Sequence, residues 1–287
     1  MTKCFFVTDL HGRTESFRKL FRTIEKEKPP VVFIGGDILP SGLQTVKTTD
    51  YTHEDFVNDF LVPGFDELKK NIGAEYPRVL LILGNDDGKY VELALLNAQG
   101  RGVWEYIHDR RVSVGDYNIY GYSYIPPTPF LLKDWERYDV SRYVDPGCVS
   151  PEEGNHTVPV SESEVKYSTI KDDLEKLVGN DDVSQSVFLF HSPPYQTALD
   201  RTALDTKIIE NVPLDRHIGS IAIRRFIEMR QPLVTLHGHV HESPRITGKW
   251  NDTIGRTYCF SAAHDGPELA LIRFELETPE YAERELI

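Results

Sequence analysis

Seven side chains that can bind a metal ion are distributed along the chain, each shortly after an apolar run. They are two aspartates, one asparagine and four histidines: Asp9, Asp37, Asn85, His11, His191, His239 and His241. The apolar runs are typical of buried strands, and open α/β sheets bind their ligands at the carboxyl ends of the strands. We therefore expect these side chains to meet at one edge of the fold and to form a metal centre.

The residue types restrict the identity of the metal. Carboxylate and amide oxygens are combined with imidazole nitrogens, and the set contains no cysteine. This mixture suits manganese, iron, nickel, cobalt or zinc better than a structural zinc cluster or a calcium cage. A carboxylate can also bridge two cations, and a metal pair can polarise a phosphoryl oxygen and generate hydroxide near neutral pH. We predict a hydrolase with two divalent metal ions, manganese being the first expectation.

The apolar periodicity predicts an α/β fold that positions these residues. Two buried strands at 4–8 and 31–34 flank a helix at 14–28, so the segment forms a βαβ unit with parallel strands and a right-handed crossover. A helix at 54–71, with an interruption at Pro63-Gly64, and a helix at 219–229 are also expected. Further strands are predicted at 79–83, 187–190, 233–236, 257–261 and 270–276, with a hairpin formed by 111–114 and 118–121.

Residues 122–163 have no regular periodicity, because prolines interrupt the stretch while aromatic residues stay frequent. A long irregular insert in a compact domain is usually functional or disordered, and the aromatic content argues against disorder. We predict that residues 1–287 form a single domain and that 122–163 is a cap or substrate loop within it. Its aromatic side chains either stack on a substrate or anchor the loop, and the sequence leaves both possibilities open.

Charge and composition restrict the partners and the location. The formal net charge of −13 argues against extended nucleic acid or an anionic membrane as a partner, because lysine and arginine provide most of the contacts to such surfaces. A small phosphorylated substrate remains compatible, since bound metal supplies local positive charge. Three widely spaced cysteines, no signal-peptide core and no apolar stretch long enough for a membrane span predict a cytoplasmic protein. The oligomeric state is not predicted.

The ordered set of motifs resembles the signature of the calcineurin-like metallophosphoesterases. The matching blocks span residues 9–241 and are Asp9-Leu10-His11, Gly36-Asp37, Gly84-Asn85, His191 and Gly238-His239-Val240-His241. The resemblance implies a four-layer α-β-β-α sandwich, with two mixed sheets flanked by helices. It also implies that Asp9, His11 and His241 bind one metal, that Asn85, His191 and His239 bind the other, and that Asp37 bridges both. The implied nucleophile is a hydroxide held between the metals.

One position departs from the family pattern. The usual block is Gly-Asn-His followed by an acidic residue, and Asp86 occupies the position of that histidine. An aspartate with an ordinary pKa is ionised at neutral pH, donates a proton poorly and repels a dianionic phosphate. We therefore predict that phosphodiesters are preferred over monoesters. The residues predicted to act in catalysis are Asp37, Asn85 and Asp86. Asp86 could instead hold water or a third cation. The alternative functions are a nuclease and a non-enzymatic protein-binding scaffold.

Other polar residues carry weaker signals. Four histidines without motif support are predicted to be ordinary surface residues: His53, His108, His156 and His217. Gly219 or Ser220 is expected either to cap the following helix or to leave its N-terminus free for phosphate.

Overall fold

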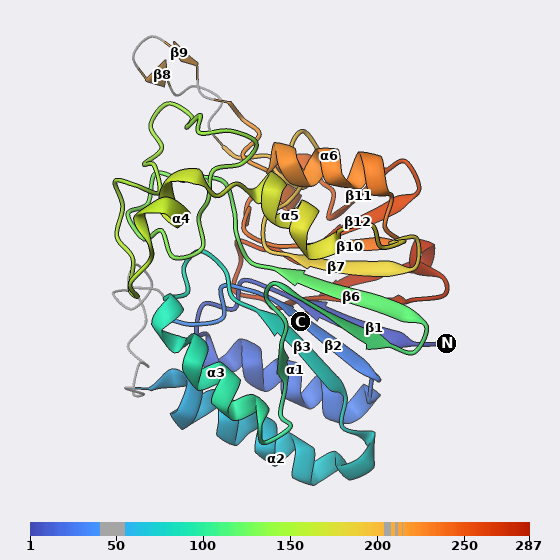
Figure 1. The fold of residues 1–287 in the computed structure, drawn as a ribbon. Coiled ribbons are helices and arrows are strands. Elements are labelled where there is room, and N and C mark those ends of the chain that lie inside the picture. Colours follow the sequence, from blue (N-terminus) through green and yellow to red (C-terminus); the bar gives the residue numbers. More distant parts are fainter. Residues whose placement is uncertain (41–54, 204–207, 210–211, 214) are drawn as a thin grey trace.

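Two six-stranded β-sheets pack against each other in the computed structural model, which describes residues 1–40, 55–203, 208–209, 212–213 and 215–287 (Figure 1). The first sheet has the order β14 (Glu283–Leu286), β13 (Ala270–Glu275), β1 (Lys3–Val7), β2 (Val31–Gly35), β3 (Arg78–Ile82) and β4 (Glu105–Tyr106). The second has the order β11 (Asn251–Ile254), β12 (Thr257–Ser261), β10 (Val234–His237), β7 (Ser186–Phe190), β6 (Tyr117–Tyr122) and β5 (Arg110–Val114). A short antiparallel pair, β8 (Ile208–Ile209) and β9 (Val212–Pro213), stands apart from both sheets.

Helices cover the outer faces of both sheets and complete the predicted four-layer α-β-β-α sandwich (Figure 1). The first sheet is covered by α1 (Thr14–Glu27), α2 (Val62–Ile72) and α3 (Glu92–Gln99), and the second by α5 (Ile170–Val178) and α6 (Ile221–Arg230). The shorter helices are α4 (Glu162–Tyr167), α7 (Ser243–Thr247), η2 (Gly73–Glu75), η3 (Lys89–Val91) and η4 (Pro279–Tyr281). None of the helices in the described ranges is long and apolar enough to cross a membrane.

The central strands are apolar along their whole length because both of their faces are buried. In β1, Cys4 and Phe6 belong to an apolar layer formed by residues of both sheets, whereas Phe5 and Val7 belong to the layer that includes the helices. The same alternation is present in β2, β3 and β7, as the two-residue period of a strand requires. The pairs β1–β2, β2–β3, β7–β10 and β10–β12 are parallel, so the predicted βαβ arrangement is confirmed.

The predicted helices form with one correction. Pro63-Gly64 does not interrupt the second helix, because a π-type turn, η1 (Val57–Leu61), leads directly into α2. The Val62 N–H bonds to the Val57 carbonyl, and Pro63 then occupies the first turn of α2, where a missing N–H is tolerated. The predicted start of this helix at Glu54 and the histidine at position 53 lie outside the described residues.

The irregular segment 122–163 has a defined structure. Isolated bridges pair Ile125 with Glu136 and Leu132 with Asn155. Lys133 and Glu136 form an ion pair whose two side chains are fully buried, and the Glu136 carboxylate also accepts hydrogen bonds from Thr128. Such a pair is well compensated because its charges are matched and hydrogen-bonded. The segment therefore has its own polar core, although it has almost no regular secondary structure.

Candidate metal centre

The seven predicted ligands follow the carboxyl ends of five strands, and these strands belong to both sheets. Asp9, Asp37 and Asn85 come after β1, β2 and β3 of the first sheet. His191 comes directly after β7, and His239 and His241 come after β10, both in the second sheet. The site therefore lies where corresponding ends of the two packed sheets meet.

The backbone is strained where these ligands leave their strands. Asp9, His11, Asp37 and His239 have positive φ values of 57°, 44°, 49° and 71°. This left-handed conformation is uncommon for residues other than glycine and costs on the order of 1 kcal/mol or more for each residue. The buried strands hold these turns in place, and the turns direct the side chains towards a common point.

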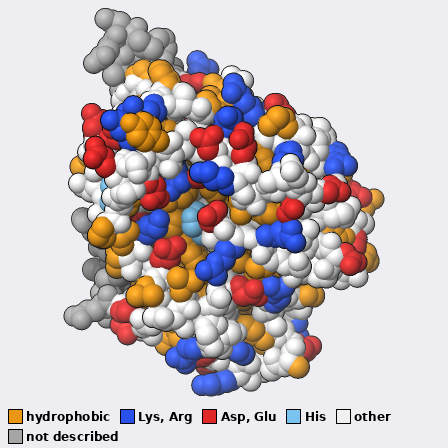
Figure 2. All heavy atoms as spheres, in the orientation of Figure 1, with side chains coloured by type: hydrophobic (Ala, Val, Ile, Leu, Met, Phe, Trp, Pro, Cys, Tyr) orange, Lys and Arg blue, Asp and Glu red, His pale blue; other side chains and the backbone are white. Residues whose placement is uncertain are grey.

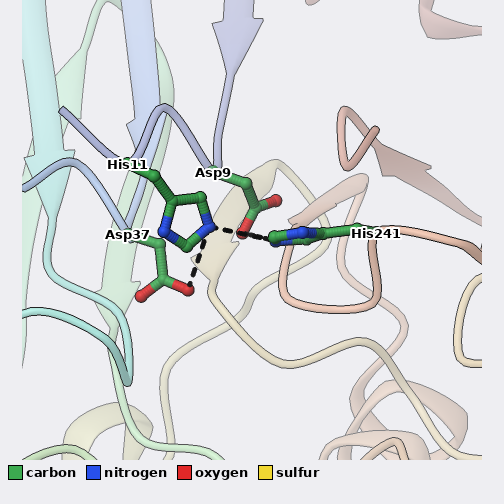
Figure 3. Close-up of side chains that lie close together, drawn as sticks. All are labelled: Asp9, His11, Asp37 and His241. Atoms are coloured by element: carbon green, nitrogen blue, oxygen red, sulfur yellow. Dashed lines mark hydrogen bonds and ion pairs between the residues drawn. The ribbon is translucent and has the colours of Figure 1, made fainter. Parts of the chain in front are cut away.

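Four of the side chains form a compact cluster (Figure 3). Each of Asp9, His11, Asp37 and His241 offers a ligand atom, and these atoms all lie within 4.8 Å of one another. His11 Nε2 is 3.2 Å from His241 Nε2, and His241 Nε2 is 3.3 Å from Asp9 Oδ1. Asp37 Oδ2 lies 3.9 Å from His11 Nε2, so its carboxylate faces this cluster. Three of the four residues are buried, and His241 is partly exposed.

A second group of ligands shares Asp37 with the first. His191 Nε2 lies 3.2 Å from Asp37 Oδ2 and 3.1 Å from Asn85 Oδ1. The other ring nitrogen, His191 Nδ1, is 2.8 Å from the Gly35 carbonyl, which selects the tautomer that donates from Nδ1 and leaves Nε2 available. The His239 ring centroid is 5.5 Å from the His191 ring centroid. The backbone N–H of His239 donates to the Asp9 carboxylate. His239 thus contacts both groups.

These separations fit two metal ions. Two ligand atoms that each lie about 2.1 Å from one cation, at angles of about 90–110°, are roughly 3.0–3.4 Å apart. The measured separations fall in this range. His241 Nε2 lies 3.2 Å from His11 Nε2 and 3.3 Å from Asp9 Oδ1. His191 Nε2 lies 3.1 Å from Asn85 Oδ1 and 3.2 Å from Asp37 Oδ2. Two imidazole Nε2 atoms that face each other are better satisfied by a shared cation than by each other. The donor set therefore fits a binuclear centre of nitrogen and oxygen ligands.

The electrostatics of the cluster also favour cations. Burial opposes the charged form of each group, but opposite charges dominate: Asp37 raises the pKa of His191 to about 10, and Asp9 raises the pKa of His241. Burial of Asp9 and Asp37 would raise the pKa values of their carboxyl groups, but His241 and His191 hold these pKa values below the usual range. Burial, together with the charge of His191, lowers the pKa of His239 to about 4. Ionised carboxylates thus face protonated imidazoles, and divalent cations can take the place of those protons.

Asp87 organises the turn that carries Asn85, a role the sequence interpretation did not assign. Its fully buried carboxylate accepts hydrogen bonds from the N–H groups of Gly84, Ile38 and Leu39 at 2.9, 3.2 and 2.8 Å. It therefore ties the loop after β3 to the loop after β2. Burial and the nearby Asp37 raise the pKa of Asp87 to about 8, while the three N–H donors act in the opposite direction.

Gly84 permits the close approach of the two loops. A Cβ atom at this position would lie 2.6 Å from Asp37 N and 2.6 Å from His191 Cε1, and it would also overlap Asp37 Oδ1. Only glycine leaves room for Asp37 and His191 to pack against this turn.

Asp86, the residue that departs from the family pattern, lies beside the cluster. Its N–H donates to Asp37 Oδ1 at 2.8 Å, and its Oδ2 is 3.5 Å from His11 Nδ1. His11 Nδ1 is buried and makes no hydrogen bond to the described residues. Burial and the neighbouring Asp37 carboxylate raise the pKa of Asp86 to about 7. Cations bound at the adjacent ligands would act in the opposite direction, because positive charge stabilises a carboxylate.

A cavity of about 700 Å³ is lined by five of the candidate ligands, His11, Asp37, Asn85, His239 and His241, and residues of the segment 122–163 form much of its wall. Pro126, Phe130, Val140 and Tyr143 contribute apolar surface from this segment. The segment is attached to the body at α6, where Asp139 accepts hydrogen bonds from the backbone N–H groups of the first turn. The segment therefore forms one wall of the cavity, and its role as a cap stays a prediction.

Two weaker sequence interpretations concern the aromatic residues of this segment and the N-terminus of α6. Tyr122, Tyr124 and Trp135 are buried, so these side chains anchor the segment rather than stack on a ligand. Phe130 is exposed and lines the cavity, so stacking stays a prediction for this side chain. Ser220 caps α6, its Oγ accepting from the Ile223 N–H, and together with Asp139 it occupies the helix N-terminus. That N-terminus is therefore not free for phosphate.

The prediction that His217 is an ordinary surface residue was wrong. It lines the cavity, and its Nδ1 lies 2.7 Å from Oδ1 of the fully buried Asp200. The two residues lie in two irregular segments, where sequence periodicity gives no signal that they meet. The only sequence signal that could have suggested the pair is the presence of a histidine and an aspartate that the fold could bring together.

Comparisons with known proteins identify the family and the fold. The family model described as calcineurin-like phosphoesterase matches residues 2–243. One solved crystal structure aligns with a TM-score of 0.61 at 17% identity, and the alignment covers 99% of this chain and 98% of that chain. The crystal structure of TT1561 of Thermus thermophilus aligns with a TM-score of 0.57 at 14% identity, with the same coverage. At these identities the two structures support the fold alone. A search of curated proteins finds no match.

Proposed function

Since the chain belongs to the calcineurin-like phosphoesterase family, we propose that it is a metal-dependent hydrolase of small phosphate esters that prefers phosphodiesters to phosphomonoesters. One observation carries this proposal. Ligand atoms of Asp9, His11, Asp37 and His241 lie within 4.8 Å of one another, and some of these residues line a cavity large enough for a small ester.

We assign the metal ligands as the family pattern implies. Asp9, His11 and His241 would hold one ion, Asn85, His191 and His239 the other, and Asp37 both. When bound, two divalent ions would offset negative charge on the phosphoryl oxygens and make a water-derived nucleophile available near neutral pH. The mixed nitrogen and oxygen ligands favour manganese, and iron, zinc, nickel or cobalt are the alternatives.

The charge of the cavity supports a phosphodiester substrate. Besides Asp37, five carboxylates belong to its wall: Asp86, Asp139, Asp145, Asp215 and Glu242. Among the described residues that line it, none is lysine or arginine. A dianionic monoester would meet more repulsion here than a monoanionic diester does, and the apolar cap residues suit an uncharged or cationic alcohol group.

The same charges disfavour a nuclease. A nucleic-acid strand needs a basic track to neutralise its successive phosphates. On the face shown in Figure 2, acidic and basic side chains are interspersed, and the described residues of that face form no continuous basic track. The acidic cavity adds to this argument.

The test compares three substrate classes with manganese-loaded protein: an aryl phosphodiester, the corresponding aryl phosphomonoester and single-stranded DNA. We expect kcat/KM for the diester to exceed that for the monoester by about tenfold or more, with little cleavage of DNA. A strict preference for the monoester would overturn the proposed specificity. Protein that binds no divalent metal and hydrolyses none of the three would favour the scaffold alternative.

A further inference from the structure

Hydrolysis of an alkyl ester requires a proton for the departing oxygen, because an alkoxide is a poor leaving group. Several acidic groups in the cavity wall already have structural partners. Asp139 accepts from Ser220 and the first turn of α6, Asp215 accepts from the Tyr195 hydroxyl at 2.5 Å, and Glu242 accepts from the Thr202 hydroxyl at 2.6 Å. These three groups are therefore poorly placed to give a proton to the substrate, and the wall offers Asp86, Asp145 and the His217 imidazole instead.

His217 and Asp200 form a pair suited to this task. The Asp200 carboxylate is fully buried and accepts the backbone N–H groups of Gln196 and Thr197, each at 2.9 Å. Its Oδ1 also lies 2.7 Å from His217 Nδ1. Because a carboxylate held by backbone donors acts as the acceptor, the imidazole donates from Nδ1. Nε2 is then the ring nitrogen that can exchange a proton with a ligand in the cavity.

The fold connects this pair to the metal-binding turn after β10. An antiparallel bridge joins His217 to Arg201, and the Thr202 N–H donates to the Arg216 carbonyl at 2.9 Å. On the other side, the Arg201 N–H donates to Ser243 Oγ and the Thr202 hydroxyl donates to Glu242. Glu242 and Ser243 directly follow His241. The same hydrogen-bonded network thus holds His217 and His241 in the wall of one cavity.

We propose that His217, oriented by Asp200, is a further catalytic residue that protonates the leaving group. Water oxygen bonds to phosphorus, the ester P–O bond breaks, and its electron pair stays on the departing oxygen. That oxygen takes the Nε2 proton of the imidazolium and leaves as an alcohol. The proton that the attacking water loses balances the reaction and restores the imidazolium by way of solvent. This inference rests on the proposed phosphoesterase function.

The test is the dependence of the rate on the leaving group. His217→Gln and wild type are loaded with manganese, their metal content is measured, and kcat is determined for diesters with leaving groups from nitrophenol to a simple alkanol. We expect unchanged metal content, a loss of about 10²-fold or more for the alkyl ester and a loss of a few-fold at most for the nitrophenyl ester. His156→Gln is the matched control, because His156 belongs to the cap but not to the residues lining the cavity.

Other results would overturn the inference in distinguishable ways. An equal loss for all leaving groups would assign His217 a binding or structural role. A leaving-group-dependent loss in Asp86→Asn, with none in His217→Gln, would transfer the role to Asp86. A wild-type protein that hydrolyses none of the esters would overturn the proposed function together with this inference.

Discussion

Gly84→Ala tests whether the metal centre depends on the close approach of the loops after β2 and β3. The new Cβ atom would lie 2.6 Å from Asp37 N and from His191 Cε1, whereas ordinary non-bonded carbon contacts begin near 3.5 Å. The shortfall is thus roughly 0.9 Å. One of the opposing atoms belongs to the backbone, so a rotamer change cannot relieve the overlap. The turn that carries Asn85 must move away from Asp37 by a comparable distance.

Two consequences follow from such a shift. Overpacking of a well-filled interior costs about 1–3 kcal/mol, which should appear as a lower free energy of unfolding in urea. A displacement of about 1 Å at a reacting centre costs about 10²-fold in rate, so kcat with an aryl phosphodiester should fall by about that factor. Metal content, measured on protein that retains its wild-type circular dichroism, should fall below two ions per chain.

Gly100→Ala is the matched control. Gly100 lies at the exposed end of α3 with a right-handed helical backbone, and an added Cβ would approach only the Asn97 carbonyl, at 3.3 Å. This variant should change the free energy of unfolding by no more than about 0.5 kcal/mol and should keep its metal. Wild-type stability, metal content and kcat in Gly84→Ala would refute the argument that the loop spacing sets the geometry of the centre.

Four further predictions follow. Asp37→Ala should lower kcat by about 10³-fold or more, because one carboxylate would serve both ions; steady-state kinetics with excess manganese checks this. Metal binding near pH 7 should release at least one proton per chain, since Asp37, against the effect of burial, raises the pKa of His191 to about 10 and the ring must be neutral to bind; calorimetry in buffers of different ionisation enthalpy counts the protons. Asp139→Ala should raise KM more than it lowers kcat, because Asp139 joins the cap to α6. Hydrogen bonds from Arg273, which outweigh the effect of burial, lower the pKa of Glu27 from 4.5 to about 2. Glu27→Gln should therefore lower the free energy of unfolding in urea by about 1–2 kcal/mol at pH 7. This difference from wild type should vanish as the pH falls from 4.5 towards 2, because the Glu27 carboxylate becomes protonated.

The sequence predicted the parts of the site that depend on local pattern. Fully apolar runs mark strands buried on both faces, and a polar residue directly after such a run is delivered to the carboxyl edge of the sheet. Asp9, Asp37, Asn85 and His191 were located in this way, and the structure brings them together.

The missed residues depend on tertiary contacts. Asp87 acts through backbone N–H groups of a loop almost 50 positions earlier in the chain, and the pairing of His217 with Asp200 arises between two irregular segments. Neither relation leaves a periodic signal. The continuity of the helix through Pro63 was missed for a similar reason, because a π-type turn has no sequence signature comparable to a proline.

The arrangement separates the groups proposed for chemistry from those proposed for selection. Four of the candidate metal ligands, Asp9, His11, Asp37 and His239, leave strained turns that two packed sheets hold in place, so small changes there should affect every ester alike. The cap contributes Phe130, Tyr143 and Asp145 to the cavity from a segment with little regular structure, where substitutions are tolerated more easily. Changes in these cap residues should therefore alter KM ratios between esters while leaving metal content unchanged. Substrate identity is accordingly best sought by varying the alcohol group of the ester rather than the metal.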